Sequence, residues 1–355
     1  MDKISINDKR VKKDFKGISF SGYKKSDAKK QLLNYLFSGK IEESCYWSGE
    51  FICAGHFIEL WDIIFQFVCD KIHLGNPRLP VYIEYRLDDF KNIVNSGYIE
   101  KELKMRNNPK IRKLFAEMIS IICLSKKKNS FDPPKVKETE FNTINLTHKL
   151  KAPTIEYGRR IFKKEDPKEL FIAINELYWN IENKNSASAF YWIEWILGFE
   201  VLCKKNNKLK LLASRREIPV ENKHQRDIIW LLWDVIFTIA KTHSKGIVKI
   251  LEGLLTMFCV RYSNGTKKKR KIMIYFGISL LTEPFDSEIP LYKNDKMIQQ
   301  VTKKIDNIYK QIKVNEVVPN TDYLFNNSIN SGNLEKTLNK IDQMNSMNNI
   351  IYQKK

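Results

Sequence analysis

The sequence predicts a mainly α-helical protein made of two divergent copies of one multi-helix bundle unit, joined by a Pro-containing basic linker. The first observation is an internal repeat, in which one seven-residue run recurs later in the chain: Glu59-Leu60-Trp61-Asp62-Ile63-Ile64-Phe65 and Leu231-Leu232-Trp233-Asp234-Val235-Ile236-Phe237. A Tyr-Trp pair precedes each run, and a basic stretch leading to an Ile-Ser pair follows each: Ile111-Arg112-Lys113 before Ile119-Ser120, and Lys269-Arg270-Lys271 before Ile278-Ser279. Apolar residues also recur at helical spacing in both halves. Solenoid repeats span roughly 20–50 residues, so a longer period indicates a duplicated multi-helix unit.

Composition agrees with a folded chain of this size. At 355 residues the length favours two domains, and each is long enough to bury a core. A hydrophobic content of 43% and seven Trp residues exclude an intrinsically disordered protein.

The first copy is expected over residues 24–125, after a basic N-terminal arm at residues 1–23. Ser26 or Asp27 is positioned to cap a helix that carries apolar residues at helical spacing and ends at Gly39. Further helices are expected over residues 42–53, 57–72, 83–94 and 111–122. Gly55 ends the second of these, and Gly75-Asn76-Pro77 ends the third.

Residues 126–167 form the predicted linker, because this stretch contains several Pro and Lys residues and its apolar residues do not recur at helical spacing. Within it, residues 141–146 have the pattern of an extended, strand-like segment.

The second copy is expected over residues 168–284, with helices at 170–181, 186–197, 227–241 and 247–258. It differs from the first mainly by a longer connection, residues 200–226. Since this connection is basic, we expect it to be surface-exposed and functionally distinct.

Residues 285–355 are predicted to form a polar C-terminal helix and a partly disordered tail. The helix spans about residues 288–313, with Met297, Val301, Ile305 and Ile308 at helical spacing. From about Asn315 onward the chain is rich in Asn and Ser, which is typical of disorder.

Six repeated aromatic residues have two interpretations: Trp61, Trp233, Tyr46, Trp47, Tyr191 and Trp192. They are candidates for stacking on bases, but their place on helical stripes favours core anchors. Asp62 and Asp234, each directly after a repeated Trp, are expected to cap a helix or to pair with a basic side chain, since neither has a second carboxylate for acid–base catalysis.

No catalytic, metal or cofactor site is expected. The six Cys residues lack CxxC spacing, and the five His residues are scattered. No serine or cysteine nucleophile motif is found, so we expect a non-enzymatic protein. Buried Cys residues, a polar N-terminus and apolar runs too short to span a bilayer predict an intracellular protein without a membrane span, in a reducing compartment.

The formal net charge of +20 favours polyanionic partners: nucleic acid, bound without sequence preference, or acidic protein surfaces. An AT-rich genome, which enriches Lys and Asn, is the alternative explanation. Four clusters, all expected in connections between helices, supply the candidate ligands: Lys126, Lys127, Lys128; Arg159, Arg160, Lys163, Lys164; Lys204, Lys205, Lys208, Lys210, Arg215, Arg216; and Lys267, Lys268, Lys269, Arg270, Lys271.

Part of the first copy resembles the collar, or oligomerisation, domain of the MgsA/RarA and Werner-helicase-interacting family of clamp-loader-type AAA+ proteins. The resemblance covers about fifty residues and lies in three runs: Ser44-Cys45-Tyr46-Trp47, Ala54-Gly55, and Cys69-Asp70-Lys71-Ile72-His73-Leu74-Gly75-Asn76-Pro77. It implies a domain that mediates oligomerisation. The chain departs from the family because it has no G-x-x-x-x-G-K-[ST] loop, so no ATPase activity is expected.

The sequence therefore predicts a basic helical scaffold that associates with nucleic acid and with replication or transcription factors as a homo- or hetero-oligomer. Its composition also looks like that of proteins from large DNA viruses, which would place it in the cytoplasm or nucleus of a host cell. The alternative is an internal or minor capsid protein that serves virion assembly.

Overall fold

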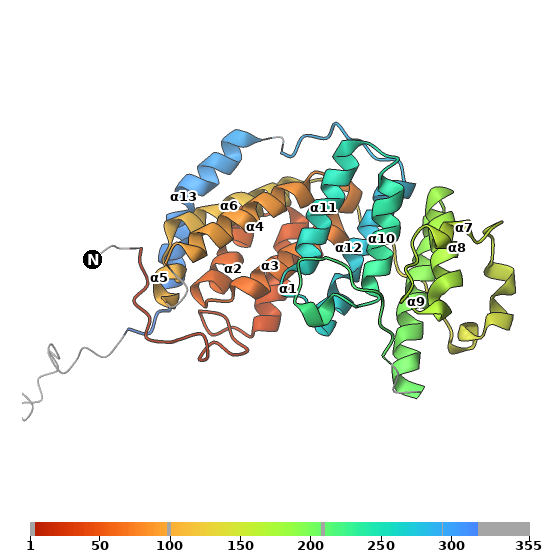
Figure 1. The fold of residues 1–355 in the computed structure, drawn as a ribbon. Helices are drawn as coiled ribbons and strands as arrows, with labels where there is room; N and C mark the ends of the chain where they lie inside the picture. The colour runs from red at the N-terminus through yellow and green to blue at the C-terminus, as the bar shows by residue number, and fades with distance from the viewer. Residues whose placement is uncertain (1–3, 98–100, 207–209, 293, 319–355) are drawn as a thin grey trace, which may run out of the picture. The chain divides into compact units, whose positions relative to one another are not determined.

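The structure, a computed structural model, describes residues 4–97, 101–206, 210–292 and 294–318 (Figure 1). In this part of the chain the regular structure is helical, with thirteen α-helices and no strand. An isolated antiparallel bridge joins Ile18 to Lys24. The predicted mainly α fold class is thus confirmed.

Contacts divide the described chain into a main body, residues 4–6 and 10–316, and a small unit formed by residues 7–9 with residues 317–318. In the small unit, Lys9 N donates to Val317 O (2.9 Å) and Val317 N donates to Asp8 Oδ2 (3.0 Å). The helices all lie in the main body. Most of the tail for which the sequence predicts partial disorder, from residue 319 onward, lies outside the described residues.

The first three helices are α1 (Lys25–Ser38), α2 (Ile41–Cys53) and α3 (Phe57–Phe67). Gly39 and Gly55 adopt φ values of 73° and 72°, a left-handed conformation that ends helices at little cost for glycine, as predicted. The predicted cap at Ser26 or Asp27 is wrong. The helix begins earlier because the backbone N–H of Asp27 already donates to Lys24 O (2.9 Å).

The end of α3 changes helical geometry twice. A π-helical turn (Val68–Ile72) and a 3-10 turn (His73–Gly75) follow it. A Cβ at Gly75 would lie 2.3 Å from Lys126 O, so only glycine permits this close approach. The buried Asn76 side chain donates to Ser125 Oγ (3.0 Å) and Leu291 O (2.9 Å), and so holds two distant segments against the turn.

Three helices complete the first half: α4 (Leu79–Asn95), α5 (Glu102–Arg106) and α6 (Pro109–Leu124). α4 and α6 were predicted, whereas α5 is too short to show a helical period. It nevertheless contributes Arg106, which is buried and donates to the carbonyl oxygens of Cys53 and Arg10.

The connection that follows α6 contains short turns: 3-10 turns at Glu138–Phe141, Thr143–Lys149 and Lys168–Leu170, and α7 (Glu156–Arg159). The predicted strand-like segment at residues 141–146 is therefore wrong. No neighbouring strand offers it a partner in the described chain. Instead Phe141 packs against Trp195, whose Nε1 donates to Glu140 O (2.8 Å), and this packing favours the compact turn.

The second half contains α8 (Phe171–Glu182), α9 (Ser186–Asn206), α10 (Ile229–Ala240), α11 (Lys245–Cys259) and α12 (Asn264–Thr282). α9 runs further than predicted and includes the first residues of the long connection. α4 packs closely on α11, since a Cβ at Gly253 would lie 2.8 Å from Pro80 O.

α13 (Asp295–Lys313) packs on α2 and α6, as Figure 1 shows for the blue helix beside α6. The predicted apolar stripe is only partly right. Ile305 is buried, but Met297 is 40% exposed, and the buried face is completed by Ile298, Tyr309 and Ile312. Tyr309 determines this face because its ring packs against the buried Arg112 guanidinium, 4.1 Å from the ring centroid.

The prediction of a surface-exposed element at residues 200–226 is wrong in part. Leu211, Ala213, Ser214 and Arg216 are buried. The nearby His224 O accepts from Trp230 Nε1 (2.7 Å). This connection belongs to the core, so its deletion would remove packing that the second half needs.

We predict that Trp233→Ala lowers the free energy of unfolding by roughly 3–5 kcal/mol, as for large aromatic side chains removed from a core. Trp233 is 1% exposed and packs against Phe258 (5.5 Å between ring centroids). Urea unfolding measures the loss, with the exposed Phe37→Ala as the control variant. Equal losses in the two variants would contradict this packing.

A second prediction concerns His73, whose ring is buried against Phe276. Burial lowers its pKa to about 4. The unfolded chain, with a His pKa of about 6.5, therefore binds the proton more tightly, and stability should fall as the pH drops from about 6.5 towards 4. Between pH 7 and about pH 4.5 this group should cost about 2 kcal/mol.

His73→Asn removes the titrating ring, and Asn is among the residues other than Gly that adopt a positive φ most often, as this position requires (φ 47°). Urea unfolding at several pH values should show a flatter acid dependence for the variant than for the wild type. Parallel curves would contradict the assignment.

Candidate nucleic-acid interface

The predicted basic clusters do not all lie in connections between helices, and that expectation is wrong. Residues 267–271 lie within α12, Lys204 and Lys205 form the last turn of α9, and Arg159 ends α7. α12 continues through its run because Lys267 and Arg270, on either side of the exposed Lys268 and Lys269, face the core and pair with acids there.

Lys267 is the centre of one such buried group. Its ammonium is 2.7 Å from Glu200 Oε2 and 2.6 Å from Asp227 Oδ1. Tyr262 OH donates to the second oxygen of Asp227 (2.9 Å). Lys267 therefore links α12 to the end of α9 and to the start of α10. Its ammonium already donates three hydrogen bonds to the two carboxylates, so none is left for a phosphate.

Arg270 is 2% exposed and donates to Asp62 Oδ1 (2.6 Å) and to two carbonyl oxygens at the end of α11. Lys271 lies 2.6 Å from Glu194 Oε1 of α9. The expectation that Asp62 pairs with a basic side chain is confirmed. These two cations stabilise the fold, and their charges are compensated.

Arg216 forms the second buried group. It bonds Asp166 through two nitrogens, and its Nε donates to Asp234 Oδ2 (2.8 Å). The expectation for Asp234 is thereby confirmed as well. Burial alone would raise the pKa of Asp166, but the hydrogen bonds from Arg216 and from two backbone N–H groups lower it overall.

Lys127 also has a structural use. Its ammonium donates to the carbonyl oxygens of Ile122 (2.9 Å), Cys123 (2.9 Å) and Ser125 (3.0 Å), at the C-terminal end of α6. A cation is favourable there because the last carbonyls of a helix lack partners. Burial lowers the pKa of Lys127.

The remaining described candidates are exposed: Lys126, Lys128, Arg159, Arg160, Lys163, Lys164, Lys204, Lys205, Lys210, Arg215, Lys268 and Lys269. Lys208 lies outside the described residues. Of the exposed set, Lys128, Arg159 and Arg160 lie within 4.0 Å of a carboxylate. The contacts of Glu200 with Lys267 and of Glu194 with Lys271 show that α9 and α12 are antiparallel, so the end of α9, which carries Lys204 and Lys205, lies beside the start of α12.

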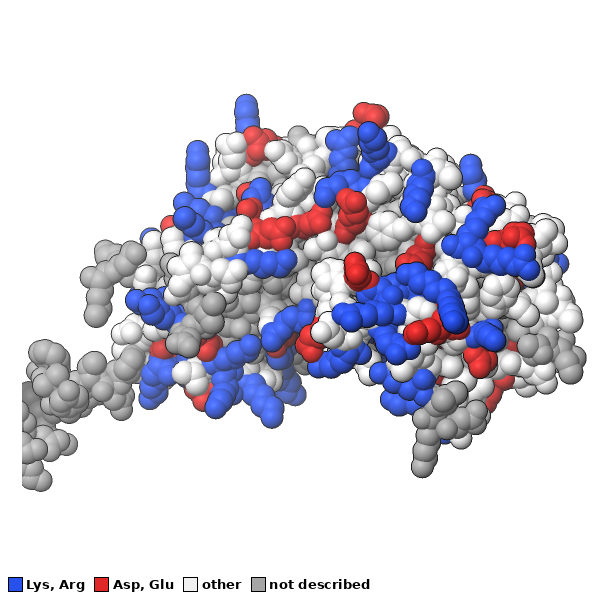
Figure 2. Space-filling view, viewed as in Figure 1, with Lys and Arg blue, Asp and Glu red and all other residues white. Residues whose placement is uncertain are grey.

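A further basic element, the N-terminal loop (residues 10–24), contains none of the predicted nucleic-acid-binding residues. Its Phe15 and Phe20 are fully buried, and Lys12, Lys13, Lys16 and Lys24 are exposed. The two Phe residues within a basic stretch are the signal that it packs on the body. Figure 2 shows Lys and Arg side chains along the lower edge of the view, where Figure 1 draws the dark-red segment before α1.

Buried polar groups hold the N-terminal loop in place. Glu50 of α2 accepts hydrogen bonds from Ser19 Oγ (2.7 Å), from Ser21 N (2.9 Å) and from Ser21 Oγ. His56 Nε2 lies within hydrogen-bond distance of Phe15 O (3.1 Å) and Ile18 O (3.0 Å). The loop is therefore an ordered platform for its lysines.

The repeated aromatic residues divide into two groups. Trp61, Trp233, Tyr191 and Trp192 are buried, which confirms them as core anchors. Tyr46 and Trp47 are only half-buried. Trp47 packs edge-on against Tyr46 (5.6 Å) and Tyr23 of the N-terminal loop (5.3 Å), and Tyr23 is 50% exposed.

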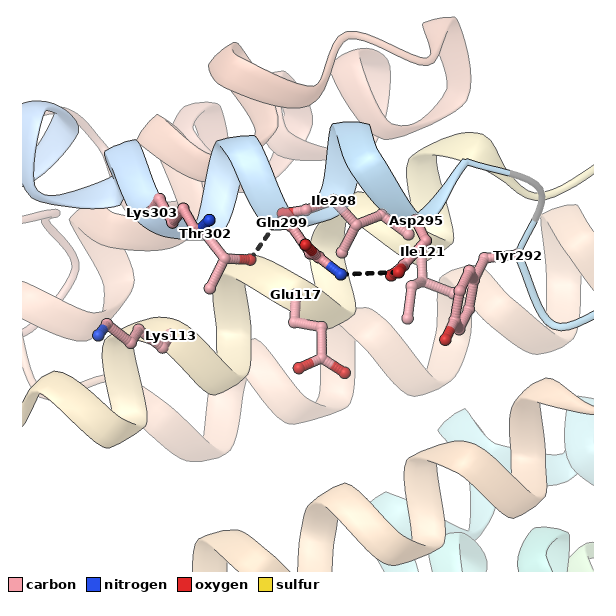
Figure 3. Close-up of a pocket in the computed structure, with 9 residues that line it drawn as sticks. All are labelled: Lys113, Glu117, Ile121, Tyr292, Asp295, Ile298, Gln299, Thr302 and Lys303. Carbon is pink, nitrogen blue, oxygen red and sulfur yellow. Dashed lines mark hydrogen bonds between the residues drawn. The ribbon is translucent and has the colours of Figure 1, made fainter.

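The described surface includes two clefts that could hold a ligand. The first, of about 400 Å³, lies between α6 and α13 (Figure 3). Lys113 and Lys303 lie at one end of it, whereas Glu117 and Asp295 lie further along. Its mixed charge does not favour a polyanion. The second cleft, of about 720 Å³, is lined mainly by apolar and aromatic side chains of α4, α11 and residues 285–291.

The described part of the chain shows neither a metal-binding cluster nor a reactive cysteine. No group of three or more His, Cys, Asp or Glu side chains within the described ranges has an arrangement that fits a metal ion. Burial raises the pKa of the Cys45 and Cys69 thiols, which disfavours the reactive thiolate. Among the described helices, none is both long and apolar enough to cross a membrane.

Comparison with protein-family models, with curated proteins and with solved structures finds no match to this chain.

Adjacent basic residues in α12 should behave in opposite ways. We predict that Arg270→Gln lowers the free energy of unfolding by about 3–5 kcal/mol, because it leaves Asp62 and two carbonyl oxygens without their buried donor. Lys269→Gln, at an exposed position, should change it by less than about 0.5 kcal/mol. Urea unfolding of both variants decides the point, and a similar loss in both would contradict the buried pairing.

Proposed function

We propose that this protein is a non-enzymatic helical scaffold that binds nucleic acid through exposed lysines, without reading its sequence. The observation that supports this most strongly is how the cations are sorted. Arg216, Lys267 and Arg270 are buried and paired. Five lysines of the same runs are instead exposed, without a carboxylate within ion-pair distance in the described chain: Lys204, Lys205, Lys210, Lys268 and Lys269. When exposed, uncompensated cations contact the phosphates of a nucleic acid, the counterions condensed on those phosphates are released, and this release favours binding.

We further propose that the scaffold consists of two divergent copies of one helical unit, α1–α6 and α8–α12. Trp61 packs against Phe90 of α4 (5.8 Å between ring centroids), and Trp233 packs against Phe258 of α11 (5.5 Å). Both indole N–H groups are buried without a hydrogen-bond partner. Both following aspartates pair with an arginine from another segment. These parallels support a duplication.

The resemblance to a collar domain supports assembly as the role of this scaffold. The run at residues 69–77 holds other segments in place: Gly75 lies against the backbone of Lys126, and Asn76 binds Ser125 and Leu291. Such contacts suit a structural unit, and we propose that the chain assembles with itself or with replication or transcription factors while it holds nucleic acid.

Electrostatic binding predicts a linear fall in log affinity with log salt, with a slope of about −0.9 per phosphate contact on duplex DNA. Replacing Lys204, Lys205, Lys268 and Lys269 together by Gln should flatten this slope by a few units and weaken binding to all sequences alike. Gel-shift titrations of random duplex and single strand at two salt concentrations measure both effects, and urea unfolding checks that the variant is folded.

A charge-matched control replaces four exposed lysines of α13, Lys296, Lys303, Lys304 and Lys310, by Gln. These lie among Asp295 and Asp306, so their removal should change the slope less. Absence of any shift at micromolar protein in low salt would refute nucleic-acid binding. That result would leave the alternative proposal, an internal or minor capsid component that serves virion assembly.

A further inference from the structure

The N-terminal loop brings lysines next to the half-exposed aromatic group formed by Tyr23, Trp47 and Tyr46. Lys25 N donates to Gly17 O (2.8 Å), and Ser19 N donates to Tyr23 O (2.8 Å). These two bonds hold residues 17–19 beside residues 23–25. Lys16 and Lys24, the direct neighbours of Gly17 and Lys25, therefore lie in the same part of the loop as Tyr23. All three side chains are exposed.

Tyr23 packs on Trp47 on one side and is open to solvent on the other. Its ring packs at 63° to Trp47, with 5.3 Å between the ring centroids, and Trp47 packs at 87° to Tyr46. Tyr46 belongs to the same turn of α2 as Glu50, which holds Ser19 and Ser21 of the loop. The aromatic ring is thus fixed on the body, and half of its surface stays free.

The exposed charges of the N-terminal loop that carries this ring are mainly positive. Lys12, Lys13, Lys16 and Lys24 are exposed, and no carboxylate within the described ranges lies within ion-pair distance of them. Asp14, the acid of the same loop, accepts a hydrogen bond from Val11 N (2.8 Å) and closes the turn that carries Lys12 and Lys13. An aromatic face beside backbone-contacting cations is the arrangement that binds unpaired bases.

We propose that the N-terminal loop is a binding site for single-stranded nucleic acid, in which an unpaired base stacks on Tyr23 and the flanking phosphates contact Lys12, Lys13, Lys16 and Lys24. This rests on the proposed nucleic-acid binding and makes it more specific. A duplex keeps its bases stacked on one another, so it contacts the lysines but gains nothing from Tyr23. The loop therefore gives the protein a preference for single strands.

The test is fluorescence anisotropy with a labelled oligothymidylate and a labelled random duplex, at low and at about physiological salt. Loss of one base–aromatic stack, about 1–3 kcal/mol, corresponds to roughly a 5- to 150-fold loss of affinity. Tyr23→Ala should show this loss with oligothymidylate and leave duplex affinity unchanged, whereas Tyr23→Phe should retain both. Replacing Lys12, Lys13 and Lys16 by Gln should weaken both ligands and flatten the salt dependence.

The matched control is Tyr85→Ala, which removes a ring of similar exposure (59%) from α4; it should change neither affinity. Thermal unfolding of each variant confirms that it is folded. If Tyr23→Ala binds oligothymidylate as the wild type does, or loses both ligands equally, the stacking site is refuted while lysine-dependent binding stands. If the wild type binds neither ligand, the proposed function itself fails.

Discussion

The structure depends on the pairing of buried cations with acids that are distant in the sequence. Arg270 of α12 binds Asp62 of α3, and Arg216 binds both Asp166 and Asp234. A buried charge without a partner costs several kcal/mol, so each of these contacts must form for the surrounding helices to pack. We infer that the pairs help to fix which segments meet, because an apolar contact alone would tolerate several registers.

Helix positions could be predicted well, because the spacing of apolar residues and the glycines that end helices are local signals. α1 to α4, α6, α8, α10 and α11 lie where the stripes predict them, within about five residues. α9 runs past its predicted end at residue 197, α13 begins after its predicted start at residue 288, and α12 was not predicted. Predictions that depended on distant contacts failed. The turn at residues 141–146 is set by packing on Trp195, and the buried face of α13 by the contact of Tyr309 with Arg112. Neither contact leaves a trace in the local sequence.

The candidate site shows the same division. A run such as residues 267–271 is uniformly basic, yet Lys267 and Arg270 face acids of other helices while Lys268 and Lys269 face solvent. The helical period separates the two kinds of position, but only once the run is assigned to a helix and not to a connection. The local sequence does not mark the N-terminal loop as a site, because Glu50 and His56, which order it, belong to another part of the chain.

The close contact of α4 with α11, where Gly253 leaves no room for a side chain against Pro80, joins two halves of one polypeptide. Between separate subunits, such an interface would dissociate on dilution. Inside one chain, the covalent connection keeps the two helices at a constant effective concentration relative to each other. The surface formed jointly by the two halves therefore persists at any protein concentration, including the few copies present when synthesis begins.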